Sequence, residues 1–179
     1  MSNNPFYKSI EEIRNIYETK QASVSEISNT FIKRIKILNP KINAYLEVFD
    51  KESITDSKKA DEYIKNGNQN ILTGIIIGLK DLVDVKGKIT SAGSKILEKN
   101  IAKSNSKITE DFNQQNSVII GKTNLVEFAF GTLGINTNTP TCRNPWDLER
   151  VPGGSSSGSA VAVSAGLCTF AIGTDTGGS

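Results

Sequence analysis

Two short runs of β-branched and other apolar residues, with a helical pattern between them, constrain the fold of this chain most. The run at 75–79 ends at Lys80, and the run at 117–120 ends at Gly121. Runs of this length and composition are typical of strands that are buried on both faces. The segment 105–116 between them predicts a helix, and a strand–helix–strand order predicts an α/β fold.

The rest of the chain predicts more helices than strands. Ser9 to Glu12 and Ser23 to Glu26 both fit capping boxes, which mark the starts of two amphipathic helices. Asn39-Pro40 predicts the end of the second helix. We further expect a strand at 43–49, a polar helix at 51–66 before Gly67, a loop region at 132–154, a tightly packed helix of small residues at 157–166 and a strand at 168–172.

Length and charge exclude several classes of protein. The chain has 179 residues, a length that fits one domain or part of a larger one. Its net charge of +2 is too small to create a strong electric field toward nucleic acid. No apolar stretch is long enough for a signal peptide or a membrane span. We therefore expect a cytoplasmic protein in which Cys142 and Cys168 are reduced, buried side chains.

The absence of histidine limits the chemistry. A chain without His contains no Ser-His-Asp or Cys-His catalytic group and no His-ligated zinc, haem or iron. A nucleophile in this chain would need another base, and lysine is the obvious one.

The densest motif is the Gly- and Ser-rich segment 153–159. A flexible linker is one explanation, but a packed apolar helix follows at once. The segment formally contains G-x-S-x-G at 154–158, yet a nucleophile elbow needs a histidine. A phosphate site at the helix start is a further alternative. Gly121-Lys-Thr123 resembles the end of a P-loop, but Asn116 occupies the position where that motif requires glycine.

Two other features point to acyl transfer. Two glycines before Ser179 allow a tight turn with converging N–H donors, as an oxyanion hole beside a nucleophile requires, although a plain turn after a strand is the simpler explanation. Lys80 closes an apolar strand. If it is solvated and paired with Asp81, it stays charged, whereas a desolvated lysine has a lowered pKa and accepts protons.

Taken together, these motifs resemble the amidase signature family. The matching segments are Gly78 to Asp81, Pro152 to Ser159 and Gly173 to Ser179, and Gly121 to Asn124, Glu127-Phe128 and Arg143 to Trp146 are also similar to that family. The resemblance implies a mixed sheet flanked by helices. Residues 1–179 would be the N-terminal portion of a single amidase domain, with a mostly helical lead-in at 1–68 and the start of the core at 70–179.

The resemblance also implies roles for particular residues. Ser179 would be the nucleophile, Ser155 would bridge to it after a cis peptide bond from Gly154, and Lys80 would be the base. The oxyanion hole would use the N–H groups of Thr176, Gly177, Gly178 and Ser179, with Ser156, Thr174 and Asp175 supporting the loops. The triad chemistry needs no metal and no organic cofactor.

The family includes two kinds of enzyme. One is the A subunit of aspartyl/glutamyl-tRNA amidotransferase, which works with partner subunits, and the other is a set of amidases acting on small or lipophilic amides. The segment 127–136 looks more like the second kind, because Phe130 and Leu133 would make that side of the pocket apolar. The serine loop differs from the usual pattern in having Ser157 where glycine is common, which leaves both presumed catalytic serines in place.

The last residue, Ser179, is the presumed nucleophile. The resembled fold is more than twice this length, so we expect a truncated piece of a working enzyme, inactive by itself. An α-carboxylate at Ser179 would oppose a developing oxyanion. A non-catalytic module is the alternative from another class. A small amide is the expected substrate, with amidotransferase subunits as possible partners and no direct nucleic-acid binding or membrane attachment.

Overall fold

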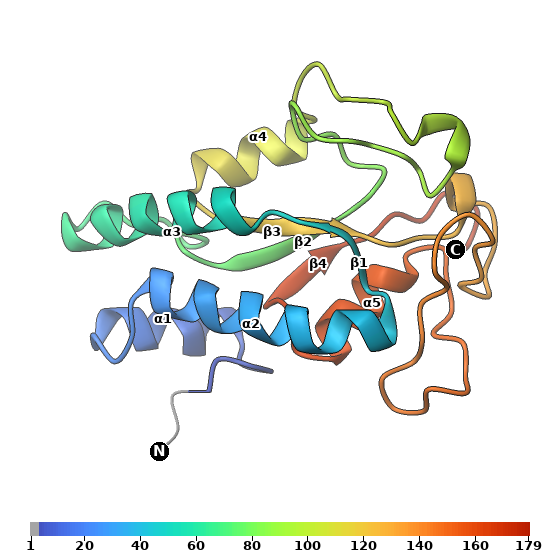
Figure 1. Cartoon of the computed structure of the whole chain (residues 1–179). Coiled ribbons are helices and arrows are strands. Elements are labelled where there is room, and N and C mark those ends of the chain that lie inside the picture. Colours follow the sequence, from blue (N-terminus) through green and yellow to red (C-terminus); the bar gives the residue numbers. More distant parts are fainter. Residues whose placement is uncertain (1–3) are drawn as a thin grey trace.

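The computed structural model describes residues 4–179, in which a mixed four-stranded sheet has helices on both faces (Figure 1). The strand order is β1-β3-β2-β4. Strand β1 (Tyr45–Val48) is antiparallel to β3 (Val118–Thr123). Strand β2 (Ile76–Lys80) is parallel to both β3 and β4 (Phe170–Ile172). The α/β class and the mixed sheet are thereby confirmed.

Within the described residues, five helices surround this sheet. Helix α4 lies on one face, and α1, α2 and α5 lie on the other (Figure 1). Each falls where the sequence predicts a helix, with its ends shifted by a few residues. The elements are α1 (Ile10–Glu18), α2 (Val24–Ile42), α3 (Asp50–Lys65), α4 (Lys107–Gln114) and α5 (Ser157–Ser164), with short 3-10 turns η1 (Lys95–Leu97) and η2 (Glu127–Ala129).

The first two helices begin at the predicted capping boxes. The Ser9 hydroxyl accepts a hydrogen bond from the Glu12 N–H at 3.2 Å, and the Glu12 carboxylate accepts one from the Ser9 N–H at 2.7 Å. Ser23 and Glu26 repeat the arrangement at the start of α2, at 3.1 and 2.8 Å. Asp61 of α3 also accepts from the Val24 N–H at 2.7 Å, so α3 helps to satisfy the exposed donors of α2.

The predicted end of α2 at Asn39-Pro40 is wrong, because the helix continues to Ile42 with Pro40 in its last turn. A proline there removes one hydrogen bond but leaves the preceding turns intact. The Asn39 side chain accepts from the Tyr45 N–H at 2.8 Å and donates to the Tyr45 carbonyl at 3.0 Å, which fixes the exit of the chain. The helix ends at Asn43, which is left-handed with φ of 53°.

Strand β3 also extends beyond its predicted end. Gly121 bounds the apolar run in the sequence, yet the strand continues through it to Thr123. A Cβ atom at Gly121 would lie 2.3 Å from the Glu47 carbonyl oxygen of the neighbouring strand. The glycine therefore permits a close approach of β1 and does not mark a turn.

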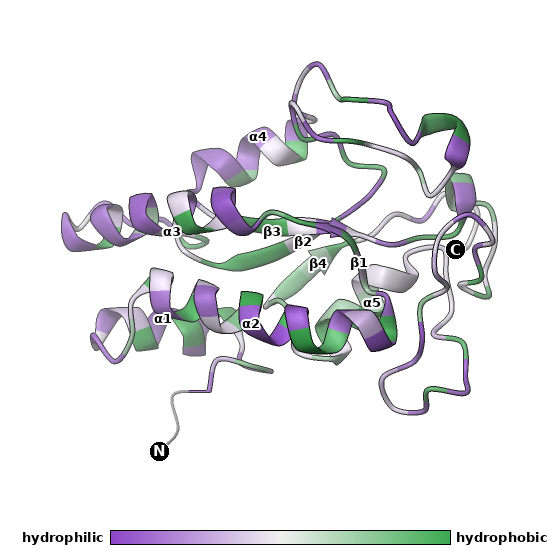
Figure 2. Ribbon diagram, in the orientation of Figure 1, coloured by the Kyte–Doolittle hydropathy of each residue, from purple (hydrophilic) through white to green (hydrophobic). Residues whose placement is uncertain are grey.

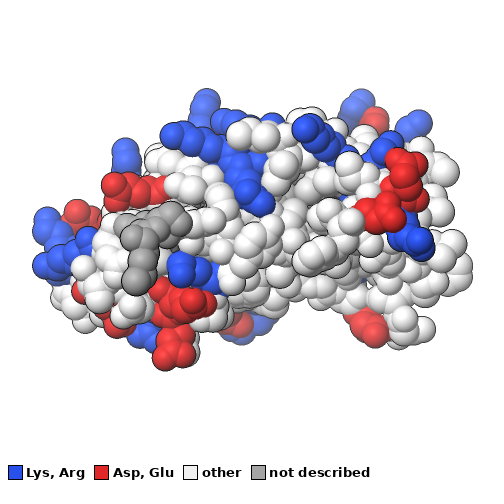
Figure 3. All heavy atoms as spheres, turned by 90° about the horizontal axis from the view of Figure 1, so that it is seen from below, with Lys and Arg blue, Asp and Glu red and all other residues white. Residues whose placement is uncertain are grey.

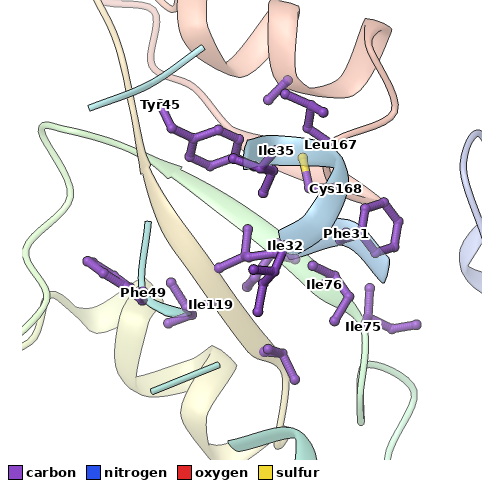
Figure 4. Close-up of a cluster of buried hydrophobic side chains, with 14 of the residues drawn as sticks. Phe31, Ile32, Ile35, Tyr45, Phe49, Ile75, Ile76, Ile119, Leu167 and Cys168 are labelled. Carbon is purple, nitrogen blue, oxygen red and sulfur yellow. The ribbon is translucent and has the colours of Figure 1, made fainter. Parts of the chain in front are cut away.

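One apolar core connects the sheet to the N-terminal helices. Phe31, Ile32 and Ile35 of α2 point toward strand residues, including Ile76 and Ile119 (Figure 4). Apolar residues line the strands and the helix faces turned toward them, while polar residues cover the outer faces (Figure 2). Full burial of each such large side chain stabilises the fold by about 1.5–3 kcal/mol.

The outer surface carries dispersed charge. Lys and Arg side chains and Asp and Glu side chains both occur on the face seen from below, separated by wide uncharged areas (Figure 3). Among residues 4–179, every helix is too short or too polar to cross a membrane.

Helix α5 packs against the backbone through Gly158, which yields a stability prediction. A Cβ atom there would lie 2.3 Å from the Asn124 nitrogen and 2.4 Å from the Ala44 oxygen, both main-chain atoms with little freedom to move. We expect Gly158→Ala to lower the free energy of unfolding by about 3 kcal/mol. The measurement is urea denaturation of the intact protein, by which we mean the full-length protein that contains these residues. Ala160→Ser, at an exposed position of the same helix, is the control and should be near neutral. Equal stability of both variants would contradict this packing.

Candidate active site

Lys80 is the last residue of β2, and its neighbours follow from the direction of the strands. Because β2 and β4 are parallel, their carboxyl ends lie at the same edge of the sheet, and Thr174 follows β4 there. The Lys80 Nζ contacts the hydroxyl oxygens of Thr174, Ser155 and Ser156 at 2.7, 2.7 and 2.9 Å. The three hydroxyls surround the amine on a side chain that is 0% exposed.

Ser155 lies just before α5, in the predicted serine loop. The peptide bond between Gly154 and Ser155 is cis, as the family resemblance implies. The Ser155 carbonyl accepts from the Val126 N–H at 3.0 Å. Next to it, the Ser156 hydroxyl accepts from the Thr174 N–H at 3.1 Å and contacts the Thr174 carbonyl at 3.2 Å. The serine loop is therefore tied directly to the segment that follows β4.

The electrostatic environment of Lys80 disfavours its charge. Burial lowers the pKa of Lys80 to about 8, and the negative charge of Asp175 opposes this shift only partly. The alternative of a solvated Lys80 paired with Asp81 does not hold. Asp81 instead forms a buried ion pair with Lys122 at 2.7 Å. At pH 7 about a tenth of Lys80 is therefore the free amine, which is able to accept a proton.

Ser179 lies on the other side of Ser155 from the lysine. The two hydroxyl oxygens are 3.4 Å apart, and the Ser155 hydroxyl also donates to the main-chain oxygen of Ser179 at 3.1 Å. The Ser179 hydroxyl is 3.4 Å from the Ala129 carbonyl oxygen. The structure thus places the three predicted residues in one row of hydroxyl and amine contacts, in the order Ser179, Ser155, Lys80.

The turn before Ser179 is held by an aspartate. The Asp175 carboxylate accepts from the Gly178 N–H at 2.6 Å and from the Ser179 N–H at 3.0 Å. In the part of the chain that the structure describes, the N–H groups of Thr176 and Gly177 have no such partner. Two of the four expected oxyanion donors are therefore bound to Asp175.

Other features of the site were not singled out from the sequence. The Ala129 carbonyl faces Ser179 because Phe128 and Ala129 are both left-handed. The Thr123 and Ser159 hydroxyls are 2.7 Å apart and link the end of β3 to α5. For the Thr123 contact, the available sequence signal was a lysine and a threonine inside an apolar strand at 121–123, because buried polar groups require hydrogen-bond partners.

The cysteines lie away from this row of contacts. Both are free and buried, and burial raises the pKa of Cys142 to about 11 and that of Cys168 to about 12. Each therefore remains a neutral thiol, as predicted. Among residues 4–179, no three His, Cys, Asp or Glu side chains are grouped so that they could hold a metal ion.

A model of the Amidase family matches residues 26–179, which include the whole site. The chain belongs to the Amidase family. It is 44% identical over 171 residues to the A subunit of glutamyl-tRNA(Gln) amidotransferase from Methylobacillus flagellatus, an alignment that covers 96% of this chain and 35% of that protein. The chain spans about a third of the length of the curated relatives that it matches.

Solved structures of family members have the same fold. The native peptide amidase from Stenotrophomonas maltophilia superposes with a TM-score of 0.86 at 27% identity, covering 92% of this chain and 35% of that chain. The A subunit of glutamyl-tRNA(Gln) amidotransferase from Thermotoga maritima superposes with a TM-score of 0.75 at 32% identity, covering 93% and 34%. The sequence identity is higher with the amidotransferase subunit, whereas the TM-score is higher with the peptide amidase.

The lowered pKa of Lys80 is open to direct measurement. In the intact protein labelled with ¹³C at the lysine ε carbons, one signal should titrate with a midpoint near pH 8. A lysine in a model peptide titrates at ~10.4. The titration with a midpoint near pH 8 should vanish in Lys80→Arg and persist in Lys107→Arg, which alters an exposed side chain. If no lysine titrates below about 9.5, this account of Lys80 is wrong.

Proposed function

We propose that the protein containing these residues hydrolyses carboxylic amides through an acyl-enzyme on Ser179. One observation carries this proposal: within residues 4–179, the buried Lys80 amine contacts only hydroxyl groups, one of which lies between it and Ser179. A lysine kept for stability would be expected to have a carboxylate partner in contact, and Lys122 has one. Membership of the Amidase family supports the same chemistry.

The first half of the reaction uses all three residues. The Ser179 oxygen attacks the amide carbonyl and forms a C–O bond, while its proton passes to Ser155 and the Ser155 proton passes to neutral Lys80. The C–N bond then breaks, and the proton returns through Ser155 to the leaving nitrogen. Ammonia or an amine departs, and the acyl group stays on Ser179 as an ester.

The second half repeats these steps with water. Water takes the place of the amine and attacks the ester carbonyl, forming a C–O bond while its proton passes through Ser155 to Lys80. The bond between the carbonyl carbon and the Ser179 oxygen then breaks, the proton returns through Ser155 to Ser179, and the acid leaves. The negative oxygen formed in each half would be stabilised by the N–H groups of Thr176, Gly177, Gly178 and Ser179. The first two are free to donate, and the last two would exchange Asp175 for the oxyanion. One such donor contributes about 10²–10³ in rate.

The proposed proton path predicts how substitutions change acylation. A fluorophosphonate probe should label Ser179 of the intact protein, and Lys80→Ala or Ser155→Ala should slow labelling by at least about 10²-fold, because base catalysis is worth roughly 10²–10⁴. Ser164→Ala, a serine of α5 away from the site, is the matched control. The rate should rise with pH and level off above about 8, because only neutral Lys80 accepts the proton. Unchanged labelling in Lys80→Ala would refute the path.

Two substrate classes have support. Phe128 and Phe130, which are 51% and 92% exposed, line a cavity of about 580 Å³ beside Glu127, as an amidase for apolar amides would require. Leu133 is exposed but does not line this cavity. The identity of 42–44% to A subunits of glutamyl-tRNA(Gln) amidotransferase supports glutamine as the amide and a misacylated tRNA, bound with the help of partner subunits, as the acceptor of the ammonia. We propose the first class, with the second as the alternative.

Purified alone, the intact protein should therefore hydrolyse an aromatic primary amide such as phenylacetamide faster than glutamine. Phe130→Ala should reduce kcat/KM for phenylacetamide by about tenfold, corresponding to ~1.4 kcal/mol of lost apolar contact, with acetamide hydrolysis changed little. Trp146→Ala, which removes an aromatic side chain that is 85% exposed, should leave both rates unchanged. Activity seen only with glutamine and co-purified subunits would instead identify the amidotransferase.

Further proposals concern the chain as a whole. We propose that residues 1–179 are the N-terminal portion of one amidase domain, supported by the family match from residue 26 and by a core shared between the helical lead-in and the sheet. Buried free thiols support a cytoplasmic location. We expect the 179-residue polypeptide by itself to be inactive, because it spans only about a third of the length of the curated relatives that it matches.

A further inference from the structure

A second lysine is buried next to the proposed site and lies outside the proton path. Lys122 of β3 pairs with Asp81 at 2.7 Å, and the two side chains are 1% and 3% exposed. Lys122 is opposite Leu79 in the sheet, whereas its neighbour Thr123 is opposite Lys80. Since side chains alternate along a strand, Lys122 extends from the other face of the sheet from Lys80.

The ion pair holds one loop in place. The Lys122 Nζ donates to the Ile89 carbonyl and to the Thr90 hydroxyl, both at 3.2 Å. The second carboxylate oxygen of Asp81 accepts from the Ser91 N–H at 2.9 Å and from its hydroxyl at 2.5 Å. The two charges together are thus bound to three successive residues of the loop, and these hydrogen bonds offset part of the cost of removing the charges from water.

That loop in turn supports the backbone beside the nucleophile. The Ala92 carbonyl, one residue after Ser91, accepts from the Phe128 N–H at 2.8 Å. Ala92, Phe128 and Ala129 are all left-handed, with φ of 51°, 52° and 56°. Such conformations are unfavourable for residues with a Cβ atom and persist where their surroundings enforce them. They turn the Ala129 carbonyl toward the Ser179 hydroxyl, at 3.4 Å.

We propose that Asp81 and Lys122 are positioning residues, which act through the loop 89–92 to hold the Phe128–Ala129 turn and so orient the Ser179 hydroxyl. The inference rests on the proposed function, because it assigns a purpose to the alignment of Ser179. It follows from an unbroken series of contacts: ion pair to loop, loop to Phe128, and Ala129 to nucleophile. A purely structural ion pair would leave the alignment of Ser179 unaffected.

The test compares kcat, KM and folding in the intact protein. Asp81→Asn and Lys122→Met each break the pair, and Ser91→Ala removes one hydroxyl contact while leaving both charges. Asp61→Asn is the matched control, a carboxylate of α3 that accepts the main-chain N–H groups of Val24 and Ser25 at the start of α2. Each variant is assayed with phenylacetamide and the fluorophosphonate probe, at a temperature where circular dichroism shows it folded.

We expect kcat and the labelling rate to fall by about ten- to a hundredfold in the two ion-pair variants, because a displacement near 1 Å costs about 10². KM should change by less than about threefold, since substrate contacts remain. Lys122→Arg should recover much of the loss. Ser91→Ala should lower kcat by about threefold, near 0.65 kcal/mol, a partial loss of one hydrogen bond. Asp61→Asn should lower the melting temperature and leave kcat unchanged.

Two results would overturn the inference. One is an ion-pair variant that is less stable but keeps the wild-type kcat and labelling rate. The other applies if neither ion-pair variant folds: Ser91→Ala with the wild-type kcat would then show that the loop does not align Ser179. Failure of the proposed function is separate, since the wild-type protein would then show no labelling beyond that of Ser179→Ala.

Discussion

Lys80 is removed from water at the edge of a sheet where several polar segments meet, and the site depends on this burial. In water its amine would be protonated and unable to take a proton from a serine. Enclosure by the hydroxyls of Ser155, Ser156 and Thr174 gives it partners that do not require a charge. The pKa of about 8 follows from that enclosure, with Asp175 limiting the shift.

The sheet provides this enclosure through its topology. Parallel pairing of β2 with β3 and β4 brings three carboxyl ends to one edge, so Lys80, Thr123 and Thr174 become neighbours although they lie far apart in sequence. Helix α5 then brings the serine loop to the same edge, through a contact at Gly158 too close for any side chain. Lys122 keeps its carboxylate partner, whereas Lys80 has none in contact among the residues that the structure describes, so the two buried lysines differ in their surroundings.

Much of this organisation could be predicted from the sequence. The capping boxes and the apolar runs identified the helices and the buried strands, and the family motifs singled out Lys80, Ser155 and Ser179, which the structure brings together. The end of α2 was wrong because the proline rule describes local backbone preference, whereas Asn39 and Asn43 fix the exit through contacts with β1. The left-handed turn at Phe128 and Ala129 was not predictable, since nothing in those residue types favours it and its cause lies in a loop some 35 residues earlier.

The long sequence separation between Lys80 and its partners has a consequence for the newly made chain. Ser155 lies 75 residues after the lysine, and Thr174 lies 94 residues after it. At ~5–20 residues per second, a ribosome takes on the order of five to twenty seconds to add that length. During this interval the amine has none of the hydroxyls that enclose it, so it remains an ordinary charged lysine. The lowered pKa of Lys80 is therefore a product of tertiary structure, absent from the nascent chain until β4 has joined the sheet.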